Sequence, residues 1–145
     1  MKINLKFGVG ELLFGMKEKD VKAIYGEPSK KFLDDDKNVI YLYNDKKLRL
    51  TFYQDEDLRL GYLIISNPAS ELFGSKVIGE SWPAIEAAAK ANGLKDFETE
   101  TFDTIDNQFN ESNWIIFQTE FENVIKIEMG AIINKDDEFD WKFKA

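Results

Sequence analysis

The sequence has 145 residues, of which 43% are hydrophobic and 32% are charged, the composition of one globular domain. Acidic side chains outnumber basic ones 27 to 19, and the net charge of −8 argues against a general nucleic-acid-binding protein. No apolar run is long enough to cross a membrane. The absence of Cys and His excludes disulfides, thiol nucleophiles and histidine triads and removes the commonest zinc ligands, so we expect no metal and no cofactor.

The N-terminal segment, Met1 to Gly8, lacks the apolar core of a signal peptide. We therefore expect a cytoplasmic protein, unless a leader was removed. The segment alternates between apolar and polar residues, and this period predicts a half-buried strand with Ile3, Leu5 and Phe7 on its buried side.

A helix is predicted over residues 17–25. Its apolar side chains have the i, i+3, i+4 spacing of one helix face, namely Val21, Ile24 and Tyr25. Gly26 and Pro28 follow directly and form a typical helix stop.

Three strands are predicted next, over residues 39–43, 48–53 and 58–65. Short polar turns join them, and apolar residues alternate with other residues in the last two, so we expect an antiparallel meander. The side chains predicted to face the core are Leu48, Leu50, Phe52, Leu58, Leu60, Tyr62 and Ile64. The opposite face then carries Arg49, Thr51, Tyr53, Arg59, Gly61 and Leu63.

The second half of the chain begins with a predicted helix over residues 81–92. Ser81 suits its N-cap, Pro83 its first turn and Gly93 its end. Strands are predicted over residues 97–103, 113–121 and 123–133, and the alternating tail from Phe139 to Phe143 predicts an additional edge strand.

Both halves, residues 1–70 and 71–145, therefore have one helix followed by three strands. This order predicts an α+β fold, with two helices side by side on one face of a curved antiparallel sheet of seven or eight strands. No linker of disordered composition separates the halves, so we expect a single domain with one continuous sheet. A tandem duplication explains the order. The alternative is a coincidence between two ordinary helix-plus-meander units.

The first half contains a recurrent pattern of glycine, proline and alternating apolar residues, carried by Phe14-Gly15-Met16, Tyr25-Gly26-Glu27-Pro28, Tyr41-Leu42-Tyr43 and Leu48-Arg49-Leu50-Thr51-Phe52. Over about residues 13 to 65 this resembles the superfamily that contains β-lactamase inhibitor protein and the small outer-membrane assembly lipoproteins. The resemblance implies helix-plus-antiparallel-sheet units, two in tandem in the inhibitor. It also implies that the chain binds other proteins and is not an enzyme.

Three departures from that pattern limit what can be transferred. Lys17 stands where the superfamily commonly has a Ser or Thr helix cap. The lipoprotein cysteine is absent, and so are the disulfides of the inhibitor. The resemblance therefore implies a fold and a manner of use, without membrane attachment and without a β-lactamase target.

Oxygen-rich segments are the candidates for a metal site. Asn134, Asp136, Glu138 and Asp140 have the alternate spacing of a calcium loop, but Phe139 occupies the position that requires glycine. The aspartates at positions 34–36 are interpreted as a solvated loop. A glycosidase that uses a pair of carboxylates is not excluded by the sequence, and an enzyme ranks last among the functions considered.

A candidate binding surface is the sheet face that points away from the helices. If Ile115, Phe117 and Phe121 face the helices, the opposite face carries Trp114, Ile116, Gln118, Glu120, Val124, Lys126 and Glu128, together with Arg49, Tyr53 and Arg59 from the first half. Trp, Tyr and Arg among polar residues are typical of protein-binding hot spots. The alternatives are an ordinary exposed amphipathic face, or burial of Trp114 beneath the C-terminal tail.

Charge is divided unevenly along the chain. Residues 1–70 hold 12 basic and 11 acidic side chains, whereas residues 71–145 hold 7 and 16, so the net charges are +1 and −9. We therefore predict a protein partner with a basic surface, as for an immunity or inhibitor protein. The alternative function is a small-molecule or lipid-binding domain with an apolar pocket between sheet and helices. An open concave face favours the first, and a deep enclosed cavity favours the second.

Overall fold

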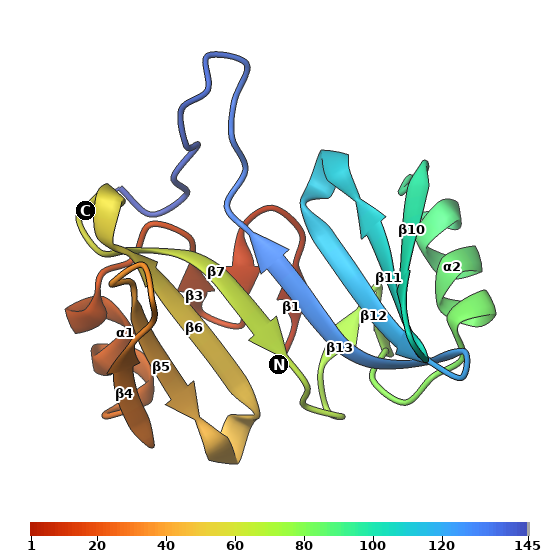
Figure 1. The fold of residues 1–145 in the computed structure, drawn as a ribbon, viewed down its shortest axis with the longest axis horizontal. Coiled ribbons are helices and arrows are strands. Elements are labelled where there is room, and N and C mark those ends of the chain that lie inside the picture. The colour runs from red at the N-terminus through yellow and green to blue at the C-terminus, as the bar shows by residue number, and fades with distance from the viewer. Residues whose placement is uncertain (145) are drawn as a thin grey trace.

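One antiparallel sheet of eight strands organises the fold, in the order β10-β11-β12-β13-β7-β6-β5-β4. The computed structural model describes residues 1–144 and has the predicted α+β class (Figure 1). The first half supplies α1 (Glu18–Tyr25), β4 (Lys30–Leu33), β5 (Val39–Tyr43), β6 (Leu48–Tyr53) and β7 (Arg59–Ile65). The second half supplies α2 (Trp82–Ala91), β10 (Phe97–Phe102), β11 (Ile105–Asn110), β12 (Ile115–Glu120) and β13 (Asn123–Gly130).

The two halves meet where β13 pairs with β7. Ile127 lies opposite Ile65, and Met129 lies opposite Leu63, all four with their side chains in the core. The single continuous sheet expected from the sequence is therefore confirmed, with one helix and four strands on each side of the junction.

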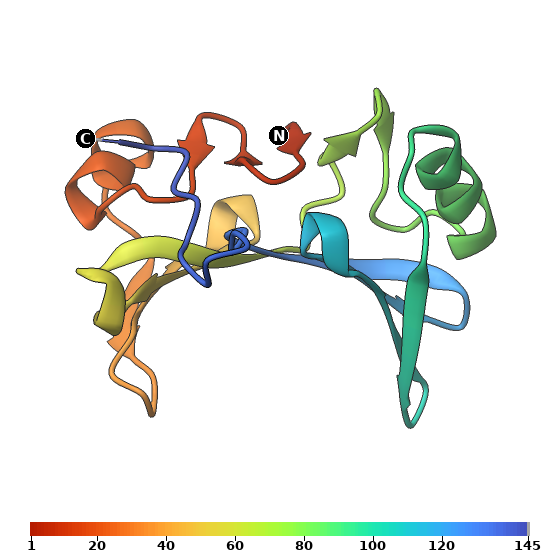
Figure 2. The same ribbon diagram turned by 90° about the horizontal axis from the view of Figure 1, so that it is seen from above.

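Both helices cover the same face of the sheet, as predicted, but they are not side by side. Figure 2 shows α1 and α2 near opposite ends of the sheet. Two small sheets lie between them, made of β1 (Ile3–Asn4), β2 (Gly8–Val9) and β3 (Leu12–Leu13), and of β8 (Glu71–Leu72) and β9 (Ser75–Lys76). Val9, Leu12 and Phe14 are fully buried, so the N-terminal segment fills the core between the helices.

The single N-terminal strand predicted from alternation is wrong. The chain turns at Lys6, whose φ of 72° is left-handed, and only Ile3 and Asn4 remain in β1. Phe7, expected to be buried, is 47% exposed. The alternation was too short to distinguish one strand from a sequence of tight turns.

Two strands of the large sheet, β4 and β11, were not predicted. In β11 the buried residues are polar, because Gln108 and Asn110 occupy core-facing positions. Their side chains have hydrogen-bond partners: Thr99 Oγ1 donates to Gln108 Oε1 over 2.6 Å, and Asn110 Nδ2 donates to the Lys95 carbonyl over 2.5 Å. Apolar periodicity cannot detect a strand whose inward residues are amides.

In β7 the predicted faces are inverted beyond Gly61. The register shifts between Thr51 and Phe52 of β6, where the chain contains a bulge. Leu60, Leu63 and Ile65 therefore point into the core, and Tyr62 and Ile64 belong to the opposite face. A bulge inserts one extra residue into a strand, so every residue beyond it points to the face opposite to the one that strict alternation predicts.

The C-terminal tail does not form the predicted edge strand. Its described part makes a single bridge between Ile133 and Phe139 and then crosses to the helix side of the sheet. There the backbone N–H groups of Lys142 and Phe143 both donate to the Phe14 carbonyl, over 3.1 and 2.9 Å. These two hydrogen bonds join the C-terminal tail to the N-terminal segment at Phe14.

The helix boundaries agree with the sequence analysis. Ser81 caps α2 by accepting a hydrogen bond from the Ala84 N–H, and Gly26 follows α1 with a left-handed φ of 77°. At α1, where a Ser or Thr cap is missing, the Asp20 carboxylate accepts a 3.0 Å hydrogen bond from the Lys17 N–H. No helix among residues 1–144 is long and apolar enough to span a membrane.

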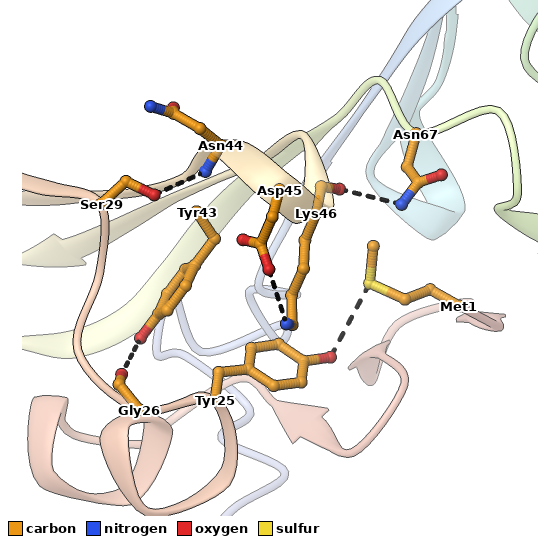
Figure 3. A network of polar contacts seen from close by, with 9 residues as sticks. All are labelled: Met1, Tyr25, Gly26, Ser29, Tyr43, Asn44, Asp45, Lys46 and Asn67. Atoms are coloured by element: carbon orange, nitrogen blue, oxygen red, sulfur yellow. Dashed lines mark hydrogen bonds and ion pairs between the residues drawn. The ribbon is translucent and has the colours of Figure 1, made fainter.

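Polar contacts tie α1 to the sheet at both of its ends. At the first turn, Glu18 accepts from the Tyr41 hydroxyl over 2.5 Å and pairs with Lys31 over 2.9 Å. Burial by itself raises the pKa of Glu18. The contacts with Tyr41 and Lys31 lower the pKa by more than burial raises it, so the net shift is downward. Beyond the last turn, the Tyr43 hydroxyl donates to the Gly26 carbonyl over 2.8 Å (Figure 3).

We predict that Tyr43→Phe lowers the free energy of unfolding by about 1 kcal/mol, because the Gly26 carbonyl loses its donor. Urea denaturation measures the change. Tyr53→Phe is the matched control, since the Tyr53 hydroxyl makes no hydrogen bond within residues 1–144. Equal losses in the two variants would show that the Tyr43 hydroxyl adds nothing specific.

Candidate functional site: the concave face of the sheet

The face of the sheet opposite the helices is open. In Figure 2 the sheet is arched, the helices lie on its convex side, and both ends bend away from them. No helix or strand of residues 1–144 covers the concave side, which Figure 1 shows from the front.

Strand register identifies one row of side chains that crosses this concave face. Residues that lie directly opposite each other in neighbouring strands point to the same side of a sheet. The row runs in the order Glu98, Phe109, Ile116, Glu128, Ile64, Arg49, Leu42 and Lys30. It extends for about 34 Å along the sheet, given the usual spacing of neighbouring strands. One end is acidic, the other is basic, and the middle is mostly apolar.

Trp114 is held in a fixed position on the concave face. It follows the short 3₁₀ helix η3 (Glu111–Asn113) with a left-handed φ of 44°, and its indole lies on Gly130. A Cβ atom at Gly130 would be only 2.7 Å from the indole ring. Tyr62 and Phe109 pack edge-on, with ring centroids 5.7 and 5.8 Å from that of Trp114. Tyr62, Phe109 and Trp114 form the aromatic cluster of the face.

A hollow of about 320 Å³ lies beside this cluster and is called the Trp114 hollow below. Its lining includes Trp114 and residues from β10, β11 and β12: Glu98, Glu100, Asn107, Phe109 and Ile116. Two carboxylates thus stand over an aromatic and aliphatic floor.

A second hollow, of about 330 Å³, lies toward the first half of the chain. Its charged lining is basic: Lys47, Arg49 and Lys126. The Arg49 guanidinium also lies 5.8 Å from the centre of the Phe32 ring, a cation–π contact that holds it at this end of the face. The concave face therefore has one acidic hollow and one basic hollow.

Glu128 occupies the middle of the row and is half-buried. Its Oε1 accepts a hydrogen bond from the Tyr62 hydroxyl. Burial raises the pKa of Glu128 above its ordinary value, because desolvation disfavours the carboxylate. The aromatic cluster and this carboxyl group are directly connected through Tyr62.

Most of the residues predicted for the binding face lie on it. Arg49, Trp114, Gln118 and Glu128 occupy the concave side, and the Gln118 amide donates to Asn107 over 3.1 Å. Glu120 ends β12 on the same side, where it accepts from Thr104 over 2.7 Å. Their role in binding stays a prediction.

Tyr53 and Arg59 lie apart from this group, next to the C-terminal tail. The Tyr53 ring lies 5.8 Å from that of Phe139, and Arg59 lies 6.0 Å from that of Trp141. Both therefore contact the C-terminal tail, at the point where β6 ends and β7 begins. The tail that was considered as a cover for Trp114 lies over these two residues instead.

Two assignments of face in the second half are wrong. Val124 is fully buried in the core, although it was placed on the open face. Phe121, expected in the core, is 78% exposed, because it forms a two-residue turn with Glu122 in which both residues have left-handed φ. The predicted strand over residues 113–121 ran one residue past the end of β12, into this turn. Val124 was misplaced because the register between β12 and β13 shifts between Gln118 and Thr119, so Val124 and Lys126 lie on opposite faces.

Sequence reasoning missed several residues of the face, notably Tyr62, Phe109 and Glu98. Tyr62 was hidden by the bulge, and the other two by the polar composition of β10 and β11. The signal available in the sequence was Gly130, since a glycine within an alternating strand often marks a close approach of another group.

The oxygen-rich segments bind their own backbone. Asn134 Oδ1 accepts from the N–H groups of Asp136 and Glu138, and Asp34 Oδ1 accepts from those of Asp36 and Asn38. Within residues 1–144 no three acidic side chains come close enough to share a metal ion. These segments are ordered turns.

The fold is similar to part of an extracellular protein containing an SCP domain from Bacillus anthracis str. Ames. The TM-score is 0.50 at 14% identity, over 79% of this chain and 42% of that one. A cysteine-rich secretory protein from Staphylococcus aureus is similar over the same shares, at a TM-score of 0.49 and 13% identity. A DUF4309 family protein from Bacillus subtilis gives 0.47 at 15% identity, over 87% and 82%.

This chain therefore spans less than half the length of the first two proteins. At such low identity, the likeness to the Bacillus anthracis protein concerns the fold alone. No protein-family model matches the sequence, and no curated protein is significantly similar to it.

We predict that Gly130→Ala lowers the free energy of unfolding by about 1–3 kcal/mol, because the new methyl group overlaps the indole of Trp114. The backbone of Gly130 is not left-handed, so no conformational strain is added. Urea denaturation of a double-mutant cycle with Trp114→Ala measures the coupling. The cost of Gly130→Ala is expected to fall below about 1 kcal/mol once the indole is absent. An equal cost in both backgrounds would contradict the contact.

We predict that Glu128→Gln stabilises the protein at pH 7 and has no such effect below pH 4. A carboxyl group with a raised folded-state pKa stabilises the fold at low pH, and this contribution is lost as the pH rises through that pKa. Glutamine keeps the acceptor for Tyr62 without the charge. Since Glu128 is half-exposed, solvent screening limits the gain to less than about 1 kcal/mol.

Denaturation midpoints between pH 3.5 and pH 7.5 test this expectation. Glu98→Gln is the matched control, because Glu98 lies in the same row but is exposed. A Glu128→Gln variant that follows the wild-type pH profile would contradict it.

Proposed function

We propose that the protein is a non-catalytic protein-binding domain and that the concave face of the sheet is its docking surface. The observation that carries the proposal is an uncovered, curved sheet of eight strands with an aromatic cluster of Tyr62, Phe109 and Trp114 near its middle. Trp and Tyr supply large contact areas at low entropic cost, and they dominate hot spots between proteins.

The rigid placement of Trp114 supports this proposal. An exposed aromatic that moves freely loses entropy when a partner binds, whereas the indole is already positioned by Gly130 and two aromatic rings. Because the partner does not have to order it, more of the contact energy contributes to affinity.

Charge supports a partner with basic groups facing the second half of the chain. The part of the face built from β10 to β13 carries Glu98, Glu100, Glu120 and Glu128 against one lysine, Lys126. Together with the net charge of −8, this favours an immunity or inhibitor protein that blocks a target with a basic surface. Arg49 and Lys30 at the other end favour acidic groups on the same partner.

The layout of the face favours an origin from two repeated units, residues 1–70 and 71–145. Each contributes one helix and four consecutive antiparallel strands, and the units meet at β7 and β13. Duplication of a small unit is a simple route to a docking surface wider than either unit could provide.

The geometry does not favour the ligand-binding alternative. That function needs an apolar pocket between the sheet and the helices. Side chains such as Phe14, Leu50 and Phe117 fill this space and are fully buried in one continuous core.

Site-specific photo-crosslinking tests the proposal in extracts of the source cells. A photoreactive amino acid replaces Ile64 at the centre of the face, and in the control it replaces Ala87, which is exposed on α2. We expect a crosslinked species only from position 64. Excess unlabelled wild-type protein should abolish it, whereas Trp114→Ala/Arg49→Glu protein should compete at least tenfold less well.

A crosslink of equal yield from position 87 would place the contact elsewhere. Competition that is unaffected by the two substitutions would contradict a role for the concave face. Circular dichroism and urea denaturation confirm that the competitor remains folded at the temperature of the assay.

A further inference from the structure

The Trp114 hollow combines two features that together select a cation. Glu98 and Glu100 project from alternate positions of β10 on the concave side, and both are exposed. Neither forms an ion pair with any residue among 1–144. The floor between them and Trp114 is formed by Phe109 and Ile116, and about 320 Å³ is open to solvent.

We infer that this hollow receives an arginine side chain of the partner protein. The inference deepens the proposed protein-binding function and rests on it. A guanidinium group can stack on the indole while its N–H groups donate to the two carboxylates. Its planar shape suits an aromatic floor better than a compact ammonium does, and it is more weakly hydrated.

The hairpin geometry alone does not set the chemistry of the hollow, because the corresponding hairpin of the first half borders a hollow of similar volume whose charged lining is basic. There, the 3₁₀ helix η1 (Asn44–Lys46) is also followed by one left-handed residue, Lys47, with φ 48°. Trp114 stands at the corresponding place after η3. Lys47 lines the basic hollow, so the same backbone position carries opposite binding chemistry in the two halves.

The aromatic floor is also fixed in advance. Trp114 also lines a further depression, together with Ile132 and Ile133. Its position is nevertheless determined by Gly130, Tyr62 and Phe109. An arginine side chain would therefore meet a ready surface.

A small arginine derivative tests the site without the partner. N-acetyl-arginine methylamide is titrated into ¹⁵N-labelled protein, and the indole N–H signal of Trp114, assigned with a Trp114→Phe variant, is followed by NMR. We expect a saturable shift. The neutral isostere, N-acetyl-citrulline methylamide, should bind at least fivefold more weakly, and the lysine derivative at least twofold more weakly.

Two double variants locate the charge requirement. Glu98→Gln/Glu100→Gln should weaken binding of the arginine derivative at least threefold. Glu71→Gln/Glu80→Gln changes the net charge equally at exposed positions outside the hollow and should leave binding within 1.5-fold. All four positions are exposed, so folding is expected to be retained.

Equal binding of arginine and citrulline derivatives, or no saturable shift at Trp114, would overturn the arginine site. The crosslink from position 64 would then still decide the proposed function by itself. Conversely, arginine binding without that crosslink would keep the cation site and reject the concave face as a protein-docking surface.

Discussion

The antiparallel pairing of β7 with β13 is the constraint on which the rest of the structure depends. Each half of the chain contributes four strands, and this one ladder joins them into a sheet wide enough to form an arch. The pairs between Ile65 and Ile127 and between Leu63 and Met129 place both central strands in one core. Because the same ladder aligns Ile64 with Glu128, it also creates the centre of the open face.

The open face owes its aromatic cluster to the same junction. Gly130 ends β13 opposite Tyr62 of β7, and the missing side chain leaves room for the indole of Trp114. The β7–β13 pair therefore brings Tyr62 and Gly130 together, and the pairing of β12 with β13 sets Trp114 beside them. Any change that shifts the register of β13 would move Gly130 from beneath the indole and disperse the cluster.

The separation of charge along the sequence becomes a separation in space. Because the halves extend in opposite directions from the junction, Glu98 and Lys30 lie at the two ends of a single cross-strand row. A partner that binds this face meets acidic groups at one end and basic groups at the other. Such a pattern orients a partner as well as attracting it, and it disfavours binding in the reversed orientation.

The sequence by itself determined the helices, the caps at Ser81 and Gly26, the α+β class and most of the large sheet, because these depend on local periodicity and on backbone preferences. It also placed Trp114 and Arg49 on the correct side. Only the tertiary structure decided the bulge that turns Tyr62 outward and the polar strand β11. Bulges and hydrogen-bonded buried amides depend on partners far away in the chain. The support of Trp114 by Gly130 depends on such a partner too. A single stretch of sequence therefore carries no periodic signal for any of these three features.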